Sequence, residues 1–336
     1  MRLPWGPLAK IQELFLKQSD FALLGCLSFE ERSCAVPERL TGRHCKQIRL
    51  LEIRDPIDAF PDNRIEAQEK VSINRDRLER AGIAFSTEVH DLLTPEDGLL
   101  DIIDYGFEYP ETKTLVLDIT ALPKRFFCLF VKRLTLFHQF DNIVATYTLV
   151  GSNGYTHEHL AEDPMSCDHL PGFAAPLPAK RGGETLVVSV GFEALSIRSL
   201  FDVYRDRRGD VKAIMSFPAD LGAIRRGWTT LREMTAETQY AVERANVEVV
   251  ATWDAETVYK VLGRWSEVAD GLTLAPFGPK PHSLAMALFA TKSDCGLYYT
   301  QPKSYNPDYS HGVGDTWAYV IKWSGIPCFD RAVSLV

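Results

Sequence analysis

No stretch of 18 consecutive apolar residues occurs in this sequence of 336 residues, so it predicts no helix that could cross a membrane. The start of the chain does not resemble a signal peptide, because Pro4, Pro7, Lys10 and Glu13 interrupt its apolar run.

Cysteine is scarce, and the seven residues form no Cys-x-x-Cys pair. A disulfide framework is therefore not expected, and the sequence favours a reducing, cytoplasmic location.

Several motifs of nucleotide-binding and catalytic proteins are also missing. The chain contains no Gly-x-x-x-x-Gly-Lys-Ser/Thr segment and no Gly-x-Gly-x-x-Gly after its first apolar run, which disfavours P-loop enzymes and dinucleotide-dependent dehydrogenases. It has no serine nucleophile elbow, no His-Glu-x-x-His segment and no catalytic Cys–His signature. We therefore expect no cofactor, and the absent motifs leave open whether the protein is an enzyme.

The charge balance limits the partners of the protein. Lys and Arg number 37 against 45 Asp and Glu, a formal net charge of −8. A protein that coats nucleic acid needs a basic surface, so non-specific nucleic-acid binding is not expected, although a local basic pocket is compatible with this charge. The length and the ordinary globular composition suggest two domains.

The two halves of the sequence repeat one order of elements. Residues 21–33 and 185–199 both begin as apolar runs and continue through Phe-Glu to Arg-Ser. Glu-Arg-Ala recurs at 79–81 and 243–245, a separation of 164 residues against 163 for the Phe-Glu pairs. In each half we expect a helix to end just after this triplet, at Gly82 or Asn246, because both residue types suit a left-handed C-cap. Any two α/β domains share a similar order of elements, but these shared details favour an internal duplication.

Predicted strands alternate with predicted helices in both halves, which indicates parallel sheets with right-handed crossovers. The sequence therefore predicts an α/β protein with two tandem Rossmann-like parallel-sheet domains, related by internal duplication with pseudo-twofold symmetry. We expect the first domain over residues 1–150 and the second, with an aromatic-rich C-terminal segment, over 184–336. Residues 151–183 are rich in Gly, Pro and His and lack periodicity, so we expect a linker there.

A Pro-Lys pair follows the fourth predicted strand of each half. The strands cover 113–120 and 271–277, and the pairs lead into helices predicted over 125–138 and 281–291. A turn that opens a helix presents free N–H groups and the positive end of the helix dipole, and a lysine adds charge. Both turns therefore suit an anionic ligand.

Ligands of open α/β sheets bind beyond the carboxyl ends of the strands, at the switch point of the topology. The predicted loops that lead there carry basic, hydroxyl and imidazole side chains. The candidate ligand-binding residues in these loops are Arg32, Thr120, Lys124, Arg125, Arg198, Arg225, Arg226, Lys280 and His282. For Arg225 and Arg226, placed in the loop after the second strand of the second half, a solvated loop without ligand contacts is the alternative.

Aromatic residues gather near the C-terminus. Residues 298–323 contain five tyrosines and two tryptophans. Aromatic rings beside cationic groups can stack a base and hold a phosphate, so Tyr299, Lys303 and Tyr305 are further candidates for ligand binding. The alternative is that this segment packs as an edge of the core.

Three residues are candidate general acids or bases: Glu30, Glu193 and His311. The two glutamates follow the first predicted strand of each half. They could instead stabilise the helices that follow, because acidic groups suit helix N-termini.

The expected linker contains a cluster of metal-ligating residue types. These weak metal candidates are His157, His159, Cys167 and His169. Their spacing matches no standard zinc finger, so we expect no bound metal.

The segment VLDITALPKRF at 116–126 resembles the strand-four motif of the CARF family of Rossmann-like ligand sensors, in which an Asp/Asn-x-Thr turn precedes a lysine and a helix. The segment APFGPKPHSLAMAL at 275–288 resembles the same element with fewer polar residues. Two such units in one chain resemble the SAVED arrangement, or a CARF dimer made covalent. The resemblance implies binding of a cyclic or linear oligonucleotide signal in bacterial antiviral defence, with Thr120, Lys124 and Lys280 at the ligand.

We therefore expect a sensor that binds a nucleotide or oligonucleotide second messenger and regulates a protein effector, with no membrane partner. Two alternatives stay open. The protein could be a nucleotide-processing hydrolase that cleaves a phosphodiester or glycosidic bond in the same cleft. It could also be a protein–protein interaction module that docks a partner through its aromatic C-terminal segment.

Overall fold

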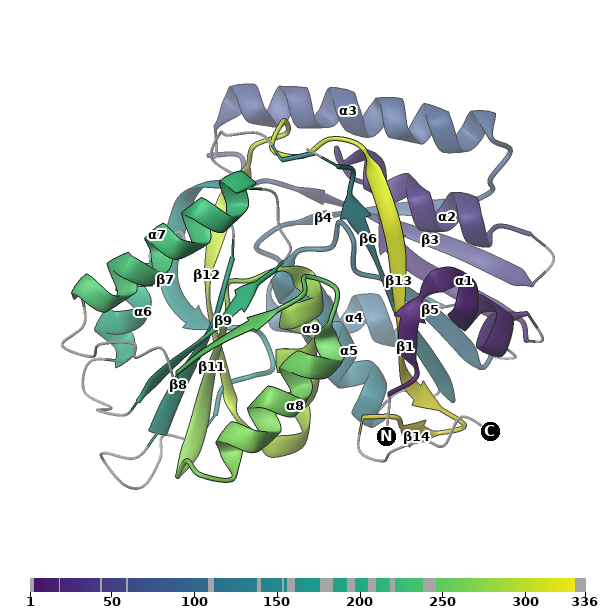
Figure 1. Cartoon of the computed structure of the whole chain (residues 1–336). Helices are drawn as coiled ribbons and strands as arrows, with labels where there is room; N and C mark the ends of the chain where they lie inside the picture. Colours follow the sequence, from purple (N-terminus) through teal and green to yellow (C-terminus); the bar gives the residue numbers. More distant parts are fainter. Residues whose placement is uncertain are drawn as a thin grey trace. The chain divides into compact units, whose positions relative to one another are not determined.

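Two sheets of mostly parallel strands, with helices between successive strands, form the framework of the computed structural model (Figure 1). The structure describes residues 3–17, 19–42, 44–58, 60–107, 112–137, 140–152, 154–155, 161–175, 184–191, 197–204, 210–217, 221–237 and 246–329. The alternation of strands and helices confirms the predicted α/β class. No helix in these ranges is both long enough and apolar enough to cross a membrane. The chain divides into unit 1, Met1–Glu158 with Ser304–Val336, and unit 2, His159–Lys303.

Unit 1 contains the eight-stranded sheet, in the order β1-β13-β6-β5-β2-β3-β4, with β14 paired to β13. Its strands are β1 (Trp5–Pro7), β2 (Phe21–Cys26), β3 (Cys45–Arg54), β4 (Ser86–Asp91), β5 (Thr114–Asp118), β6 (Asn142–Val150), β13 (Val313–Trp323) and β14 (Ile326–Pro327). Its described helices are α1 (Leu8–Ile11), the π-helical η1 (Gln12–Leu16), the 3-10 helix η2 (Glu31–Cys34), α2 (Ala35–Leu40), α3 (Pro61–Arg80), α4 (Glu96–Asp104) and α5 (Lys124–Phe137). Strands β2 to β6 are parallel, whereas β13 is antiparallel to both β1 and β6.

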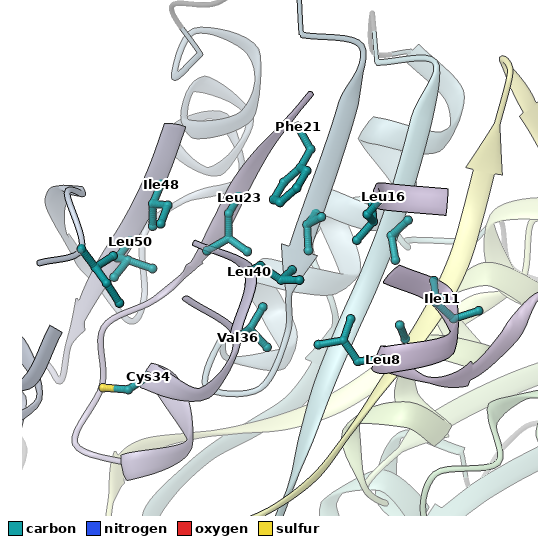
Figure 2. Packing of buried hydrophobic residues seen from close by; sticks show 14 of the residues in the cluster. Leu8, Ile11, Leu16, Phe21, Leu23, Cys34, Val36, Leu40, Ile48 and Leu50 are labelled. Atoms are coloured by element: carbon teal, nitrogen blue, oxygen red, sulfur yellow. The ribbon is translucent and has the colours of Figure 1, made fainter. Parts of the chain in front are cut away.

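Helices cover both faces of this sheet. Right-handed crossovers place α2 and α3 on one face, and α4 and α5 on the other, because the chain reverses direction across the sheet after β4. Figure 2 shows the core on the first face, where Leu23 and Leu50 of the strands meet Val36 and Leu40 of α2. The neighbouring Leu24 is equally buried and points to the opposite face. Burial on both faces explains why the strands are continuous apolar runs.

Unit 2 contains the six-stranded sheet, in the order β10-β9-β8-β11-β12-β7. Its strands are β7 (Ala161–His169), β8 (Glu184–Val190), β9 (Val211–Ser216), β10 (Val247–Val250), β11 (Gly271–Pro276) and β12 (Gly296–Tyr305). Its described helices are α6 (Ile197–Tyr204), α7 (Leu221–Glu237), α8 (Ala255–Ser266) and α9 (Lys280–Ser293). A buried cluster that includes Leu186, Leu200, Leu231 and Phe277 forms the core on one face.

The two sheets share one topology. In each sheet the parallel strands of one half lie in the order third, second, first, fourth, fifth: β4-β3-β2-β5-β6 in unit 1 and β10-β9-β8-β11-β12 in unit 2. Both Pro-Lys turns lead into helices, at Lys124 and Lys280, as predicted. The repeated strand order is what an internal duplication produces.

In each unit, the strand that follows the fifth parallel strand in the chain belongs to the sheet of the other unit. The sequence did not predict this exchange of sixth strands. Strand β7 follows the fifth strand of unit 1 but lies beside β12 in the sheet of unit 2, within the expected linker 151–183. Strand β13 follows the fifth strand of unit 2 but pairs with β6 from Val150 to Ile143 in unit 1. The chain therefore divides differently from the expected domains 1–150 and 184–336. The backbone edge of β6 needs a partner, and β13 supplies it.

Two local predictions have different outcomes. Helix α3 ends at Arg80, and Gly82 has a φ of 71°, which is the left-handed stop predicted from the sequence. The matching stop at Asn246 follows residues 238–245, which lie outside the described ranges. The prediction of a loop at Arg225 and Arg226 is wrong, because both residues lie in α7, which begins at Leu221. Their neighbours Ala223 and Ile224 do not interrupt a helix.

Candidate functional site

The topological switch point of unit 1 lies between β2 and β5. Strand β2 is followed in the chain by its neighbour β3, and the chain later returns to β5 on the other side of β2. The loops after β2 and β5 therefore diverge at the C-terminal edge of the sheet, which is where open α/β sheets bind ligands. The loop after β2 leads to Glu30 and Arg32, and the loop after β5 leads to Lys124 and Arg125.

Glu30 and Arg32 form a buried ion pair in the first of these loops. Their exposed fractions are 5% and 3%. The Nε of Arg32 donates to Oε2 of Glu30 at 3.0 Å, and Nη2 donates to the same oxygen. Burial by itself would lower the pKa of Arg32, but Glu30 together with Tyr147, Tyr309 and Tyr155 outweighs it, and the pKa lies well above its ordinary value. Arg32 is therefore held charged inside the protein.

Glu30 has further partners within the protein. Ser310 donates its hydroxyl to Oε2 of Glu30 at 3.1 Å, and the Asn74 amide donates to the Glu30 carbonyl at 3.2 Å. The Glu30 side chain makes no capping hydrogen bond to η2, although Glu30 is the residue that precedes this helix. The Glu30 carboxylate, which was a candidate general base, is thus enclosed by Arg32 and Ser310, and it accepts hydrogen bonds from both.

Three tyrosines surround the ion pair. Arg32 donates from Nη1 to the Tyr147 hydroxyl and from Nη2 to the Tyr309 hydroxyl, both at 3.3 Å. Burial raises the pKa of Tyr155 and of Tyr309 far above the ordinary value of a phenol. Glu30 adds to this shift in both cases, so these hydroxyls remain protonated donors beside the carboxylate.

A second polar network continues below the turn after β5. The Oδ1 of Asp118 accepts from the backbone N of Thr120 at 3.1 Å and from its hydroxyl at 2.5 Å. The Thr120 hydroxyl accepts from the backbone N of Thr148 at 2.9 Å, and the Thr148 carbonyl accepts from Arg32 at 3.0 Å. Thr120 is fully buried. Its side chain therefore orders the turn and connects it to Arg32, instead of facing a ligand.

Lys124 and Arg125 open α5 directly after this turn. Lys124 is 9% exposed. Arg125 donates from Nη2 to the Thr94 carbonyl at 2.7 Å, and its Nε is buried with no hydrogen-bond partner among the described residues. Burial lowers the pKa of Arg125, with a small opposing effect from Tyr305. Arg125 is thus a partly exposed arginine whose Nε is shielded from water, and its hydrogen bond within the described ranges goes to a carbonyl.

His282 of unit 2 has an internal role in the structure. Its Nε2 lies 2.9 Å from the Ala251 carbonyl and its Nδ1 lies 3.3 Å from the Ser189 hydroxyl. A carbonyl only accepts, so Nε2 carries the proton and Nδ1 accepts from Ser189. His282 is fully buried, and it connects α9 to β8 and to the loop after β10. Gly278 is required there, because a Cβ would lie 2.0 Å from the Ser189 hydroxyl oxygen.

The remaining ligand candidates do not all come together. Glu193 lies outside the described residues, and Arg198 lies on α6, where only the backbone is described. Lys280 is partly exposed at the start of α9, and Arg225 is exposed on α7. In unit 1, the strand end at Tyr305 lies within electrostatic range of Arg125. In unit 2, Lys303 is partly exposed on β12, and Tyr299 packs against Phe277 with ring centroids 5.5 Å apart.

The metal and acid–base candidates are also separated. His157 and His159 lie outside the described residues, and within those ranges no group of three or more His, Cys, Asp or Glu side chains is placed to hold a metal ion. Cys167 is buried, which raises its pKa to about 11, and His169 packs against Tyr298 with ring centroids 4.3 Å apart. His311 is exposed in unit 1, where its backbone N donates to the Gly154 carbonyl at 2.6 Å.

Sequence reasoning missed Asn74, Tyr147, Tyr155, Tyr309 and Ser310 as parts of this site. Tyr155 and Tyr309 lie in aromatic segments that were visible in the sequence, but nothing local connects them to Glu30. Asn74 lies in the middle of the polar helix α3, where a buried asparagine has no sequence signal.

Comparisons with known proteins give no family. No protein-family model matches the chain, and no curated protein matches it. Among solved structures, a protein described as a universal stress protein from Pseudomonas aeruginosa is 10% identical, with a TM-score of 0.26, over 85% of this chain and 94% of its own. The cytoplasmic domain of a prokaryotic cation chloride cotransporter is 8% identical, with a TM-score of 0.22, over 85% and 96%. Haemonchus contortus phosphoethanolamine N-methyltransferase 1 is 7% identical, with a TM-score of 0.24, over 76% and 69%. Sequence identities and TM-scores this low do not assign a function to the chain.

Proposed function

We propose that unit 1 binds the anionic group of a nucleotide or oligonucleotide at the C-terminal edge of its sheet, and that the protein is a sensor of such a ligand. The observation that supports this proposal is the incomplete hydrogen bonding of the Arg125 guanidinium. Its Nε is buried without a hydrogen-bond partner in the described ranges, in the first turn of α5, the helix that follows β5 at the switch point. A phosphate would supply both the missing acceptor and the missing negative charge.

The energetics support an anion at this position. Burial of the Nε of Arg125 removes hydration that no hydrogen bond within the described ranges replaces, and this costs free energy in the folded protein. Lys124 precedes Arg125, and both lie in the first turn of a helix of 14 residues, whose N-terminal N–H groups favour negative charge. Three sources of positive potential therefore converge on one place.

The finer parts of the proposal draw on the resemblance to CARF and SAVED sensors. That resemblance supports an oligonucleotide second messenger as the ligand, a protein effector as the partner, and a cytoplasmic role in bacterial antiviral defence. Binding would act by shifting the population of two conformations, one of which the effector recognises.

The structure favours binding over hydrolysis. Two carboxylates lie near the switch point: Glu30 is 5% exposed and accepts from Arg32 and Ser310, and Asp118 is 2% exposed and accepts from Thr120. A general base must reach the proton that it abstracts, and both carboxylates are enclosed.

Calorimetry tests the proposal with the full chain and a panel of pyrophosphate, ATP, cyclic di-adenylate, and linear and cyclic tetra-adenylate. Arg125→Ala and Lys124→Ala should each weaken the binding partner of the panel by about 10- to 100-fold, the range for hydrogen bonds to charged groups. Lys113→Ala is the matched control, because exposed Lys113 precedes the same strand β5 at its opposite end. Equal affinities in wild type and Arg125→Ala would refute the assignment. Chromatography of the same mixtures would reveal cleavage products and so identify a hydrolase.

A further inference from the structure

A segment from the C-terminal part of the chain crosses the edge at which the proposed ligand binds. We call residues Ser304–His311 the strap; they comprise the last two residues of β12 and the segment that leads from it towards β13. The strap contacts the loops that follow three different parallel strands of unit 1, namely β3, β2 and β6. Because those strand ends share one edge of the sheet, the strap lies along that edge.

The first anchor of the strap is Asp55, in the loop after β3. Its Oδ2 accepts from the Ser304 hydroxyl at 2.9 Å and from the Tyr305 backbone N at 3.4 Å. Asp55 thereby fixes the beginning of the strap within the same unit.

The second anchor is Lys70 of α3. Its Nζ donates to the Pro307 carbonyl at 3.0 Å and to Oδ1 of Asp308 at 2.5 Å. Lys70 also pairs with Glu66 at 2.9 Å and is 26% exposed. Lys70 thus holds the middle of the strap through a charge contact at the protein surface.

The third anchor is the buried ion pair. Tyr309 accepts from Arg32, and Ser310 donates to Glu30. Tyr309 also packs edge-on against Phe29, with ring centroids 6.2 Å apart. The end of the strap continues to Gly154, whose carbonyl accepts from the His311 backbone N.

The strap also approaches the proposed ligand group. Tyr305 lies close enough to Arg125 to affect its pKa. Ligands of open α/β sheets occupy the space beyond the strand ends, and here part of the chain crosses that edge.

We propose that the strap is a latch: it covers the C-terminal edge when anchored, and ligand binding at Arg125 is coupled to its release. This inference rests on the proposed function, because it describes the regulation of the same site. The strap continues directly from β12, whose residues Gly296–Lys303 belong to unit 2, into β13 of unit 1. Release of the strap would therefore pull on a strand of the other unit through the chain itself.

The experiment loosens the second anchor without touching Arg125. Full-length Lys70→Gln and Asp308→Asn variants are compared with wild type and with Arg80→Gln, a control that removes a cation of α3 that is 82% exposed. Hydrogen–deuterium exchange of residues 304–311 reports strap release, and calorimetry with pyrophosphate and ATP reports binding. If the anchored strap excludes the ligand, a larger open fraction tightens the apparent affinity in proportion. We expect about 5-fold faster exchange and about 5-fold tighter binding in both variants, and no change in Arg80→Gln.

Other outcomes overturn the latch in distinguishable ways. Unchanged exchange in both variants would show that Lys70 does not hold the strap. Faster exchange with unchanged or weaker binding would show that the strap does not exclude the ligand; in that case a loss of binding in Arg125→Ala would leave the proposed function intact. Absence of pyrophosphate and ATP binding in wild type and in both loosened variants would overturn the latch together with the phosphate site.

Discussion

Glu30 and Arg32, two residues apart in the chain, form an ion pair whose members are only 5% and 3% exposed. Removal of one member leaves the other charge buried without its partner, which typically costs about 3–5 kcal/mol. Glu30→Gln should therefore lower the free energy of unfolding by about that amount, measured by urea denaturation. Glu31→Gln, next to it but exposed, should change the free energy by less than about 0.5 kcal/mol. Equal stabilities of wild type and Glu30→Gln would show that Glu30 is not a structural partner of Arg32.

Arg125 should show a conflict between stability and binding. The ligand-free protein carries the cost of the buried, unpaired Nε of Arg125, so Arg125→Met should raise the free energy of unfolding by about 1 kcal/mol while it weakens ligand binding by about 10- to 100-fold. Arg133→Met in the same helix is the control: Arg133 pairs with Asp104 at 2.7 Å, and its removal should cost up to about 1 kcal/mol. Thermal unfolding without ligand provides the measurement. Destabilisation by Arg125→Met as large as that by Arg133→Met would contradict the assignment of a buried, unpaired Nε.

Gly106 is needed because of Arg49. A Cβ at residue 106 would lie 1.6 Å from Nη1 of Arg49, which donates to the Ile102 carbonyl at 2.6 Å. Gly106→Ala must displace this 2% exposed guanidinium and should cost at least about 2 kcal/mol. Gly263→Ala in α8 is the contrasting control: nothing lies within 4 Å of its Cβ position, so it should stabilise the protein by about 0.5–1 kcal/mol. Urea unfolding of both variants measures whether the free energy of unfolding falls in Gly106→Ala and rises in Gly263→Ala. A Gly106→Ala protein as stable as wild type would argue against this placement of Arg49.

Asp55 should give a pH-dependent stability. Burial raises its pKa above the ordinary 3.8, and the hydrogen bonds from Ser304 and Tyr305 offset this only in part. Well below pH 3.8 the Asp55 carboxyl is protonated in both the folded and the unfolded protein. As the pH rises above 3.8, the unfolded chain loses this proton before the folded protein does, so the free energy of unfolding falls. The fall stops once the pH exceeds the raised pKa of the folded protein. The stability of Asp55→Asn relative to wild type should therefore rise as the pH increases through the ordinary pKa of 3.8, and it should level off once the pH exceeds the raised pKa of the folded protein. Asp101→Asn, an exposed control in α4, should show no such rise. A difference that is constant with pH would rule out this ionisation as its cause.

The parallel core of each unit could be predicted from the sequence because its signals are local. Apolar runs gave β2 and β5, and Gly82 gave the end of α3. The assignment of β7 and β13 to sheets could not be predicted, because it depends on which strand edge is open after the rest of the unit has folded. A propensity pattern describes a strand but does not name its partner.

In the candidate site, too, some features could be predicted from the local sequence and others could not. Arg32, Lys124 and Arg125 follow apolar runs, so their position at one sheet edge followed from the pattern. Thr120 and His282 were expected at the ligand but bond within the protein, to the Thr148 backbone N and the Ala251 carbonyl. Those partners are set by strand register and helix packing, which the sequence of a turn does not encode.

The exchange of sixth strands has a consequence for synthesis of the chain on the ribosome. Strand β6 ends at Val150, but β13, which covers its edge, begins only at Val313. At translation rates of about 5–20 residues per second, that edge waits roughly 8–33 s for its partner. Unpaired strand edges are where nascent chains associate wrongly. Slow passage through unit 2 would therefore lengthen the exposure of unit 1, and we expect the yield of native protein to depend on the speed at which the second half is translated.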